Sequence, residues 1–279
     1  IMSLLDKTNL LITPNAVKSG KLYSVIPSSG TGDCTVVRNT TATRVNSAGL
    51  IVSVVANSPR INYLTAGGIP FILDEPQSTN LVTYSNDVSQ SIWIKQDVNI
   101  TLNAGISPDG LNNAIKITST GAAGNLRNQY NNANVLNHTR SIWAKTVSGT
   151  GKTSLMAFSG NANVLFDITN QWQRFNLNTY GGTGGASFYA VDFRAAGNTL
   201  TEILIYESQA EAGGLTSNIF TQAAAVTRNA DVITVSPPAG TVKITTTFSN
   251  DTTQVITSIP ALFTVPEGLI KQVLMQSSL

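Results

Sequence analysis

Aromatic residues beside amide side chains are the groups of this chain best suited to bind a ligand. Tyr130 is flanked by Asn and Gln residues from position 128 to 132, and Tyr180 precedes a glycine-rich run. An aromatic ring can stack on the C–H face of a sugar, and amides can pair with its hydroxyl groups. We predict a glycan-binding site at Tyr130, Asn131 and Tyr180, the alternative being loop aromatics that bind nothing. The three tryptophans lie in strand-like segments, where we expect sandwich-core or strand-edge positions rather than a binding surface.

Groups that could perform catalysis are sparse. The single histidine, His138, lies in an Asn-rich segment, where we expect a loop or surface residue rather than a catalytic base. Two acid pairs, Asp192 with Glu202 and Glu207 with Glu211, have the residue type that glycosidases use. Both pairs lie in strand-and-turn contexts with no further catalytic signature. We therefore predict that the chain is not an enzyme.

No cofactor is predicted either. The glycine-rich run 181–186 lacks the Gly-Lys-Ser/Thr ending of a phosphate-binding loop. Cys34 has no His or second Cys near it, so we expect a buried, inert side chain. A structural calcium ion stays open as an alternative, although no EF-hand spacing is present. Its oxygen ligands would come from Asp74, Glu75, Asp87 and Asp192.

The composition indicates a β-rich protein with a neutral polar surface. Charged residues make up 11% of the chain, against roughly 25% in ordinary globular domains. Thr, Asn and Ser supply most of the polar residues, and they favour strands and turns. The net charge is +2 and the basic residues are scattered, so no nucleic-acid partner is predicted. No apolar run reaches the roughly 18 residues of a membrane helix, so no membrane partner is predicted.

Short strands at regular spacing must position these residues. Turn signals such as Pro108–Gly110 separate them, and no segment keeps a helical period over a full helix. The pattern predicts an all-β fold built around an antiparallel jelly-roll β-sandwich. The expected strands are Ile69–Leu73, Trp93–Leu102, Ala114–Thr118, Ser141–Lys145, Ser154–Phe158, Val164–Ile168, Arg174–Leu177, Ser187–Phe193 and Thr201–Tyr206.

Three regions are predicted along the chain. Residues 1–66 form an extended N-terminal attachment region, residues 67–231 form the jelly-roll domain, and residues 232–279 form a small C-terminal β unit. We expect the N-terminal region to be held by a partner rather than to fold by itself. The C-terminal unit is too small for an independent core. Both regions need partners, so we predict a homo-oligomer, with a trimer favoured.

Three motifs follow one another near the end of the jelly-roll domain: Q-x-E-x-G, T-S-x-I-x-T and T-R-x-A-D. Their residues are Gln209, Glu211, Gly213, Thr216, Ser217, Ile219, Thr221, Thr227, Arg228, Ala230 and Asp231. Upstream, the segments 43–51, 73–81, 84–95 and 107–110 add matches in the same order. Together they resemble phage virion structural proteins of the head-fibre, tail-fibre or appendage type, as in tailed phages of Bacteroidota hosts. In that family the domain is a jelly roll similar to a carbohydrate-binding module.

The resemblance implies a non-catalytic structural component of a tailed-phage virion. It implies a capsid or tail fibre, spike or decoration protein that residues 1–66 anchor to other virion proteins. It also implies a structural role at the end of the sandwich for Gln209, Glu211, Gly213, Thr227, Arg228 and Asp231. The alternative function is a glycan-binding adhesin that recognises host surface polysaccharide. A secreted bacterial carbohydrate-binding module is less favoured, because we find no secretory signal in the first residues.

Overall fold

The computed structural model describes residues 7–27, 33–129, 137–158, 164–180 and 187–278. Within these ranges the strands pair antiparallel and no α-helix occurs, so the predicted all-β class is confirmed. The chain forms two compact units: one spans Ser78–Thr227, and the other combines the chain up to Gln77 with the chain from Arg228 onward. In the described ranges, no helix has the length and apolar character needed to cross a membrane.

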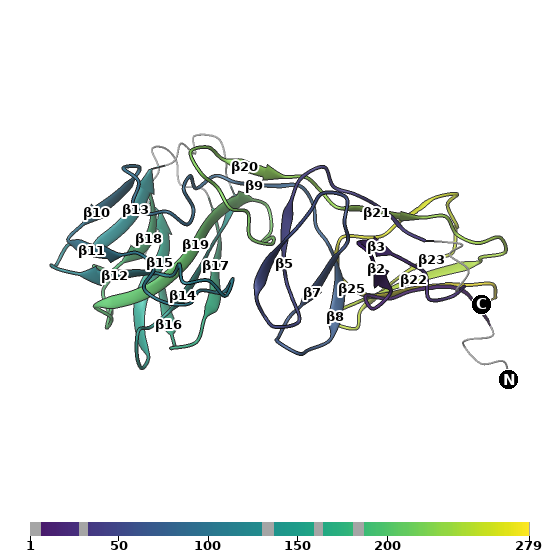
Figure 1. Cartoon of the computed structure of the whole chain (residues 1–279), viewed down its shortest axis with the longest axis horizontal. Coiled ribbons are helices and arrows are strands. Elements are labelled where there is room, and N and C mark those ends of the chain that lie inside the picture. Colours follow the sequence, from purple (N-terminus) through teal and green to yellow (C-terminus); the bar gives the residue numbers. More distant parts are fainter. Residues whose placement is uncertain (1–6, 28–32, 130–136, 159–163, 181–186, 279) are drawn as a thin grey trace. The chain divides into compact units, whose positions relative to one another are not determined.

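The Ser78–Thr227 unit is a sandwich of two five-stranded sheets (Figure 1). The first sheet has the order β10 (Trp93–Gln96), β13 (Asn125–Gln129), β18 (Ser187–Asp192), β15 (Gly151–Phe158) and β16 (Leu165–Ile168). The second sheet has the order β11 (Val98–Thr101), β12 (Ile115–Ser119), β19 (Glu202–Ala212), β14 (Asn137–Lys145) and β17 (Gln173–Tyr180).

The path of the chain through these sheets is that of a jelly roll. From β12 to β19 the strands fall in the second, first, second, first, first, second, first and second sheet in turn. The resulting orders β12-β19-β14-β17 and β13-β18-β15-β16 are those of a jelly roll, and β10 and β11 each extend one edge. The predicted jelly-roll sandwich is therefore confirmed.

The core of the sandwich lies between its two sheets. Side chains of a strand alternate between faces, so Ile203 and Ile205 of β19 both point inward and are buried. Trp93 of β10 packs against Phe188 of β18 edge to face, with ring centroids 6.4 Å apart. Packing in this apolar layer holds the two sheets together, and each sheet has its other face directed outward.

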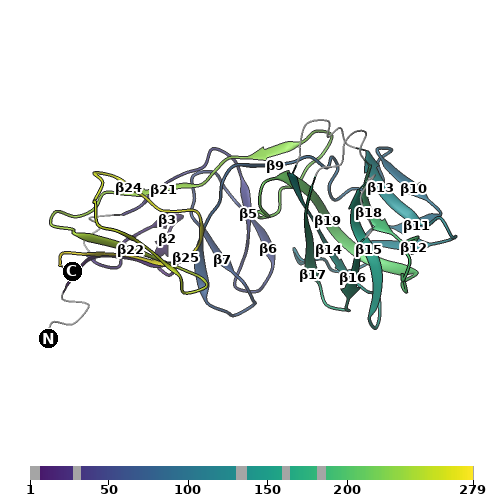
Figure 2. The same cartoon turned by 180° about the vertical axis from the view of Figure 1, so that it is seen from behind.

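The second unit is built from both ends of the chain. Its main sheet has the order β23 (Thr253–Ile256), β22 (Lys243–Phe248), β25 (Gly268–Gln276), β8 (Pro70–Asp74) and β7 (Arg60–Tyr63), and β1 (Thr8–Ile12) also pairs with β25 (Figure 2). A three-stranded sheet joins β24 (Phe263–Thr264), β21 (Val232–Val235) and β4 (Thr35–Val37). The remaining pairs of this unit are β2 (Val17–Lys18) with β3 (Lys21–Leu22) and β5 (Ala42–Val45) with β6 (Ile51–Val54). One more pair, β9 (Ser78–Asn80) with β20 (Val226–Arg228), lies where the chain passes from one unit to the other.

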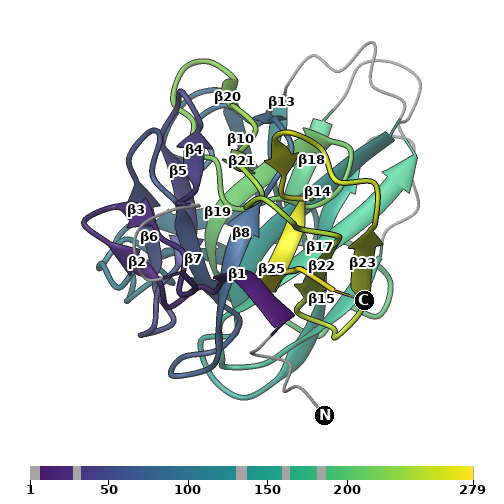
Figure 3. The ribbon, with the colours of Figure 1, turned by 90° about the vertical axis from the view of Figure 1, so that its right-hand side faces the viewer.

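This arrangement differs from the predicted three regions. We expected residues 1–66 to be extended and residues 232–279 to be a separate unit, but β1 lies against β25 (Figure 3), and the two regions share one core. Leu10 and Ile12 of β1 are buried in that core with Val273 and Met275 of β25. The apolar run at the N-terminus thus finds its partner at the other end of the same chain.

Candidate functional site

The predicted glycan-binding residues fall largely outside the part of the chain that the structure describes. Tyr130, Asn131 and the glycine-rich run 181–186 lie outside the described residues. Tyr180 is the last residue of β17 and pairs with Asn137 at the start of β14. Its side chain also lies outside the description. The structure therefore provides no geometry for that predicted site.

The outer face of the second sheet offers a different candidate. Trp143 of β14 lies opposite Arg174 of β17 and Tyr206 of β19, so these three side chains share a face. Arg174 donates from Nη1 to the Thr216 carbonyl oxygen at 2.7 Å and from Nη2 to Ser141 Oγ at 2.9 Å. These bonds fix the guanidinium next to the half-buried Trp143 indole.

Two exposed amides continue this face along β17. Asn176 lies opposite Ser141, and Asn178 lies opposite Thr139, whose Oγ1 donates to Asn178 Oδ1 at 3.1 Å. An indole beside uncharged amides supplies both a stacking surface and hydrogen-bonding groups. We call Trp143, Asn176 and Asn178 the Trp143 platform.

Trp143 and Trp172, which we expected at core or strand-edge positions, are both half-buried and lie outside the apolar core. Trp143 is half-buried and donates from Nε1 to Asn218 Oδ1 at 3.3 Å. Trp172 precedes β17 and donates from Nε1 to the Ile106 carbonyl oxygen at 2.9 Å. The distance from Lys145 Nζ to the centroid of the Trp172 ring is 5.3 Å. The indole N–H needs a hydrogen-bond partner, and both rings find theirs in loops outside the sandwich.

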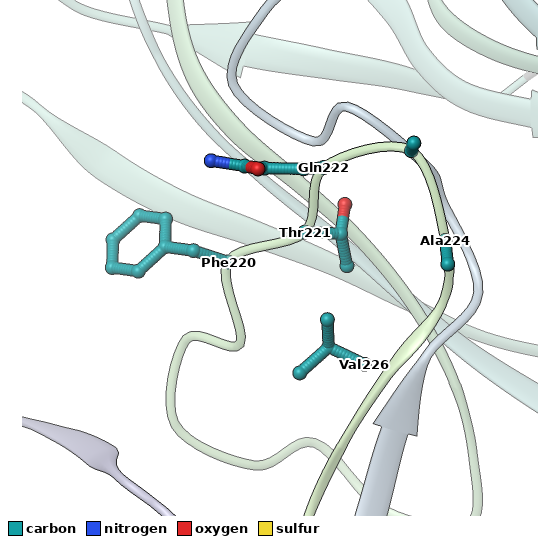
Figure 4. Close-up of a pocket in the computed structure, with 6 residues that line it drawn as sticks. Phe220, Thr221, Gln222, Ala224 and Val226 are labelled. Carbon is teal, nitrogen blue, oxygen red and sulfur yellow. The ribbon is translucent and has the colours of Figure 1, made fainter.

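An open hollow of about 570 Å³ lies on the segment 220–226 (Figure 4). Its lining is uncharged: Phe220, Thr221, Gln222, Ala223, Ala224 and Val226. Phe220 is 38% exposed and packs edge to face on Tyr206, with centroids 6.1 Å apart. The hollow contains no group able to act as a general acid, general base or metal ligand.

Gln209 and Glu211 of β19 bind the loop that follows their strand. Glu211 accepts hydrogen bonds from the Thr216 N–H at 2.9 Å, from Thr216 Oγ1 at 2.6 Å and from Ser78 Oγ at 2.5 Å. Gln209 donates to Glu211 at 2.8 Å and accepts from the Ile219 N–H at 2.8 Å. All five side chains are buried. The motif residues therefore hold the 216–219 loop against the second sheet.

The rest of the motif forms a buried charge cluster in the other unit. Asp231 accepts from Arg38 Nη1 at 2.7 Å, also accepts from Arg60 Nη2, and lies 3.8 Å from Arg228 Nη1. Glu75 bridges Arg60 at 2.8 Å and Arg228 at 3.4 Å. The three arginine side chains are fully buried. These contacts join β7, the end of β8 and the chain after β20.

Two further buried carboxyl groups have raised pKa values. Burial, together with the negative charges of Asp231 and Glu267, raises the pKa of Asp74 to about 8. Burial also raises the pKa of Glu207 well above its usual value, and its carboxyl group accepts a hydrogen bond from Ser85 Oγ at 3.1 Å. Glu207 is the extra residue of a bulge in β19 and has a φ of 48°.

The candidate acid pairs have separate partners. Asp192 accepts both Nε and Nη2 of Arg194 at 2.8 Å, and Glu202 lies 3.6 Å from Lys116. Glu207 bonds to Ser85, whereas Glu211 bonds into the 216–219 loop.

His138, expected in a loop or at the surface, is instead a buried residue of β14, and burial lowers its pKa. Cys34 is buried as expected. Among the described residues, no three His, Cys, Asp or Glu side chains gather in a set that could hold a metal ion. Of the four carboxylates considered as calcium ligands, Asp87 accepts from Ser89 and Gln90, and Asp192 is bound to Arg194.

Comparisons with known proteins give little further guidance. No family model matches the chain, and no curated protein matches it. Among solved structures, the chain is similar to the CBM22-1–GH10 modules of the N-terminal endo-1,4-β-D-xylanase 10B of Clostridium thermocellum, complexed with xylohexaose. The TM-score is 0.33 and the identity 11%, covering 50% of this chain and 29% of that one. The chain thus spans less than a third of that structure, and a likeness of this size identifies neither a ligand nor an activity.

Proposed function

We propose that the chain is a non-catalytic structural protein of a tailed-phage virion, displayed as a fibre, spike or decoration on the capsid or tail. One observation carries the proposal. The residues on which the resemblance rests, Gln209, Glu211, Arg228 and Asp231, are buried and hold segments of the fold together. Residues with that role mark a scaffold rather than an active site.

In this proposal the chain is a homo-oligomer, with a trimer favoured, and the unit that contains residues 1–66 attaches it to other virion proteins. Apolar side chains at the surface of that unit support the attachment. Leu64 and Ile69 flank the turn between β7 and β8 and are 60% and 64% exposed, and Val55 is 67% exposed. A partner that covers the turn between β7 and β8 would bury Leu64 and Ile69 together.

The test is mass spectrometry of phage particles purified from a lysate, followed by antibody labelling of intact particles in the electron microscope. We expect the chain in the purified particles at a fixed ratio to the capsid protein. A chain that is abundant in the lysate but absent from the particles would overturn the proposal.

A second candidate function, glycan binding by a host-attachment module, is supported by the Trp143 platform. Its exposed asparagines and half-buried indole present uncharged groups that suit a sugar. The test is a glycan array with the Asn176→Ala, Asn178→Ala double variant and the Tyr130→Ala, Tyr180→Ala double variant. Loss of binding only in the first places the site on the platform, and loss only in the second places it at the loops predicted from sequence. No binding by the unmodified oligomer rules the function out.

A further inference from the structure

A cationic cluster lies on the outer face of the first sheet, on the opposite side of the sandwich from the Trp143 platform. Arg127 of β13 lies directly opposite Tyr189 of β18. The pairing of these strands shifts between Leu126 and Arg127, where Ala190 is an extra residue in β18. Such a bulge redirects the side chains that follow it. Tyr189 and Asp192 consequently share the outer face with Arg127.

Two guanidinium groups gather on the Tyr189 ring. The Arg127 Cζ lies 5.7 Å from the ring centroid, and the Arg194 Cζ lies 5.1 Å from it. Arg194 is fixed by its two hydrogen bonds to the buried Asp192. Arg127 Nη1 is fixed by the amide oxygens of Gln96 and Asn125, each at 2.9 Å. The cluster is therefore held in place before any ligand arrives.

The charges in this cluster do not cancel. Asp192 balances Arg194, but the partners of Arg127 are neutral amides. Two cations close together would gain from an anion placed between or beside them, and a guanidinium fork matches the planar geometry of a carboxylate or phosphate. Arg127 is half-buried and the Arg194 side chain is 37% exposed, so both are accessible to a ligand.

We propose that the Arg127–Tyr189–Arg194 cluster is a binding site for an oxyanion, a carboxylate or a phosphate, carried by an acidic polysaccharide. The exposed Gln96 amide and the Tyr189 phenol add neutral groups that can pair with sugar hydroxyls. The proposal goes beyond the virion role. It also uses a face other than the Trp143 platform, so the failure of either leaves it standing.

The test is calorimetric titration of the purified full-length chain with three probes: an oligogalacturonate, a poly(glycerol phosphate) oligomer and a neutral glucan oligomer. The variants are Arg127→Gln, which removes a charge that is hydrogen-bonded to two neutral amides, and Arg194→Gln. The matched control is Lys152→Gln, which removes a charge from an exposed pair with Asp167 in the same unit. Thermal melting establishes that each variant is folded.

We expect at least one acidic probe to bind more weakly as salt is raised, because screening weakens the attraction of exposed charges. Arg127→Gln should lower its affinity at least about tenfold, and Lys152→Gln should leave it unchanged. Binding of only the galacturonate identifies a carboxylate source, and binding of only the glycerol phosphate identifies a phosphate source. Failure of both acidic probes, equal binding of the neutral glucan, or full binding by a folded Arg127→Gln variant would each overturn the proposal.

Discussion

Glu207 is an acidic residue in surroundings that disfavour its charged form. It is a buried carboxyl at a β-bulge, with a backbone φ of 48° that most side chains avoid. Its pKa is raised in the folded chain, so the fold retains the proton over a pH range in which the unfolded chain has lost it. Stability contributed by this group is complete below the unfolded pKa and falls as the pH rises through the range.

Glu207→Gln should therefore stabilise the protein at alkaline pH. Glutamine keeps the shape of the protonated acid without the charge, so the gain at pH 8 should be about 1–3 kcal/mol and should vanish near pH 4. Thermal melting over this pH range measures it. Glu202→Gln is the control, because Glu202 lies on the same strand with its side chain 37% exposed. An equal gain in both variants would show that burial of Glu207 is not the cause.

Arg228→Ala should destabilise the protein by about 3–5 kcal/mol, because it removes one partner from a buried charge cluster. Arg228→Lys should not restore stability, since Arg228 also donates to the Pro76 and Asn229 carbonyl oxygens and a lysine lacks that fork. Chemical denaturation measures both. Lys152→Ala, which breaks an exposed pair, should cost less than about 1 kcal/mol. Unchanged unfolding of Arg228→Ala would contradict a structural role.

At the scale of elements, the turn after β19 contains two adjacent glycines, and its backbone requires glycine at only one of these positions. Gly213 has a φ of 88°, whereas Gly214 has no such conformation, and neither has an atom within 4 Å of an added Cβ. Gly213→Ala should cost about 1–2 kcal/mol through backbone strain, and Gly214→Ala should change stability by less than about 0.5 kcal/mol. Melting temperatures of the two variants decide the matter. Equal melting temperatures would show that the positive φ of Gly213 does not limit which residues this turn accepts.

Strand prediction succeeded where apolar residues alternate and failed where polar ones are buried. β12, β16 and β18 lie within a residue of their predicted bounds. We expected one strand over Trp93–Leu102, but Asp97 adopts a φ of 46° and the chain changes sheets there. β13 was missed because Asn125–Gln129 contains a single apolar residue. β19 was ended at Tyr206 because its buried continuation, with Gln209 and Glu211, reads as a turn.

The same limit applies to the sites. Local patterning identified Gln209, Glu211, Arg228 and Asp231 through a resemblance, but it could not show which distant groups they contact. Asp231 meets Arg38, which is 193 residues away along the chain. The Arg127–Tyr189–Arg194 cluster also depends on strand pairing and a bulge, which leave no short motif. Contacts of this kind become visible only when the topology is known.

At the scale of the whole molecule, the two units have different kinds of continuity. The jelly roll is one uninterrupted segment, Ser78–Thr227, whereas the other unit needs both chain ends. Its core combines Leu10 and Ile12 with Val273 and Met275, and β25 lies between β22 on one side and β1 and β8 on the other. Removing residues 228–279 takes away β25, the central strand of this sheet. Removing residues 1–77 takes away β1 and β8, two of the strands that pair with β25.

Fragments should therefore behave unequally. A fragment of residues 78–227 should fold alone and melt cooperatively, because its core is complete and its length exceeds that of the smallest stable domains. Fragments 1–77 and 228–279 should each be unfolded, and mixing them should restore strand signal in circular dichroism, since β1 and β8 regain β25. Independent folding of fragment 228–279 would instead favour the separate C-terminal unit expected from its sequence. Because the jelly roll carries both the Trp143 platform and the Arg127–Tyr189–Arg194 cluster, its cooperative folding as a fragment would also allow both binding tests on that unit by itself.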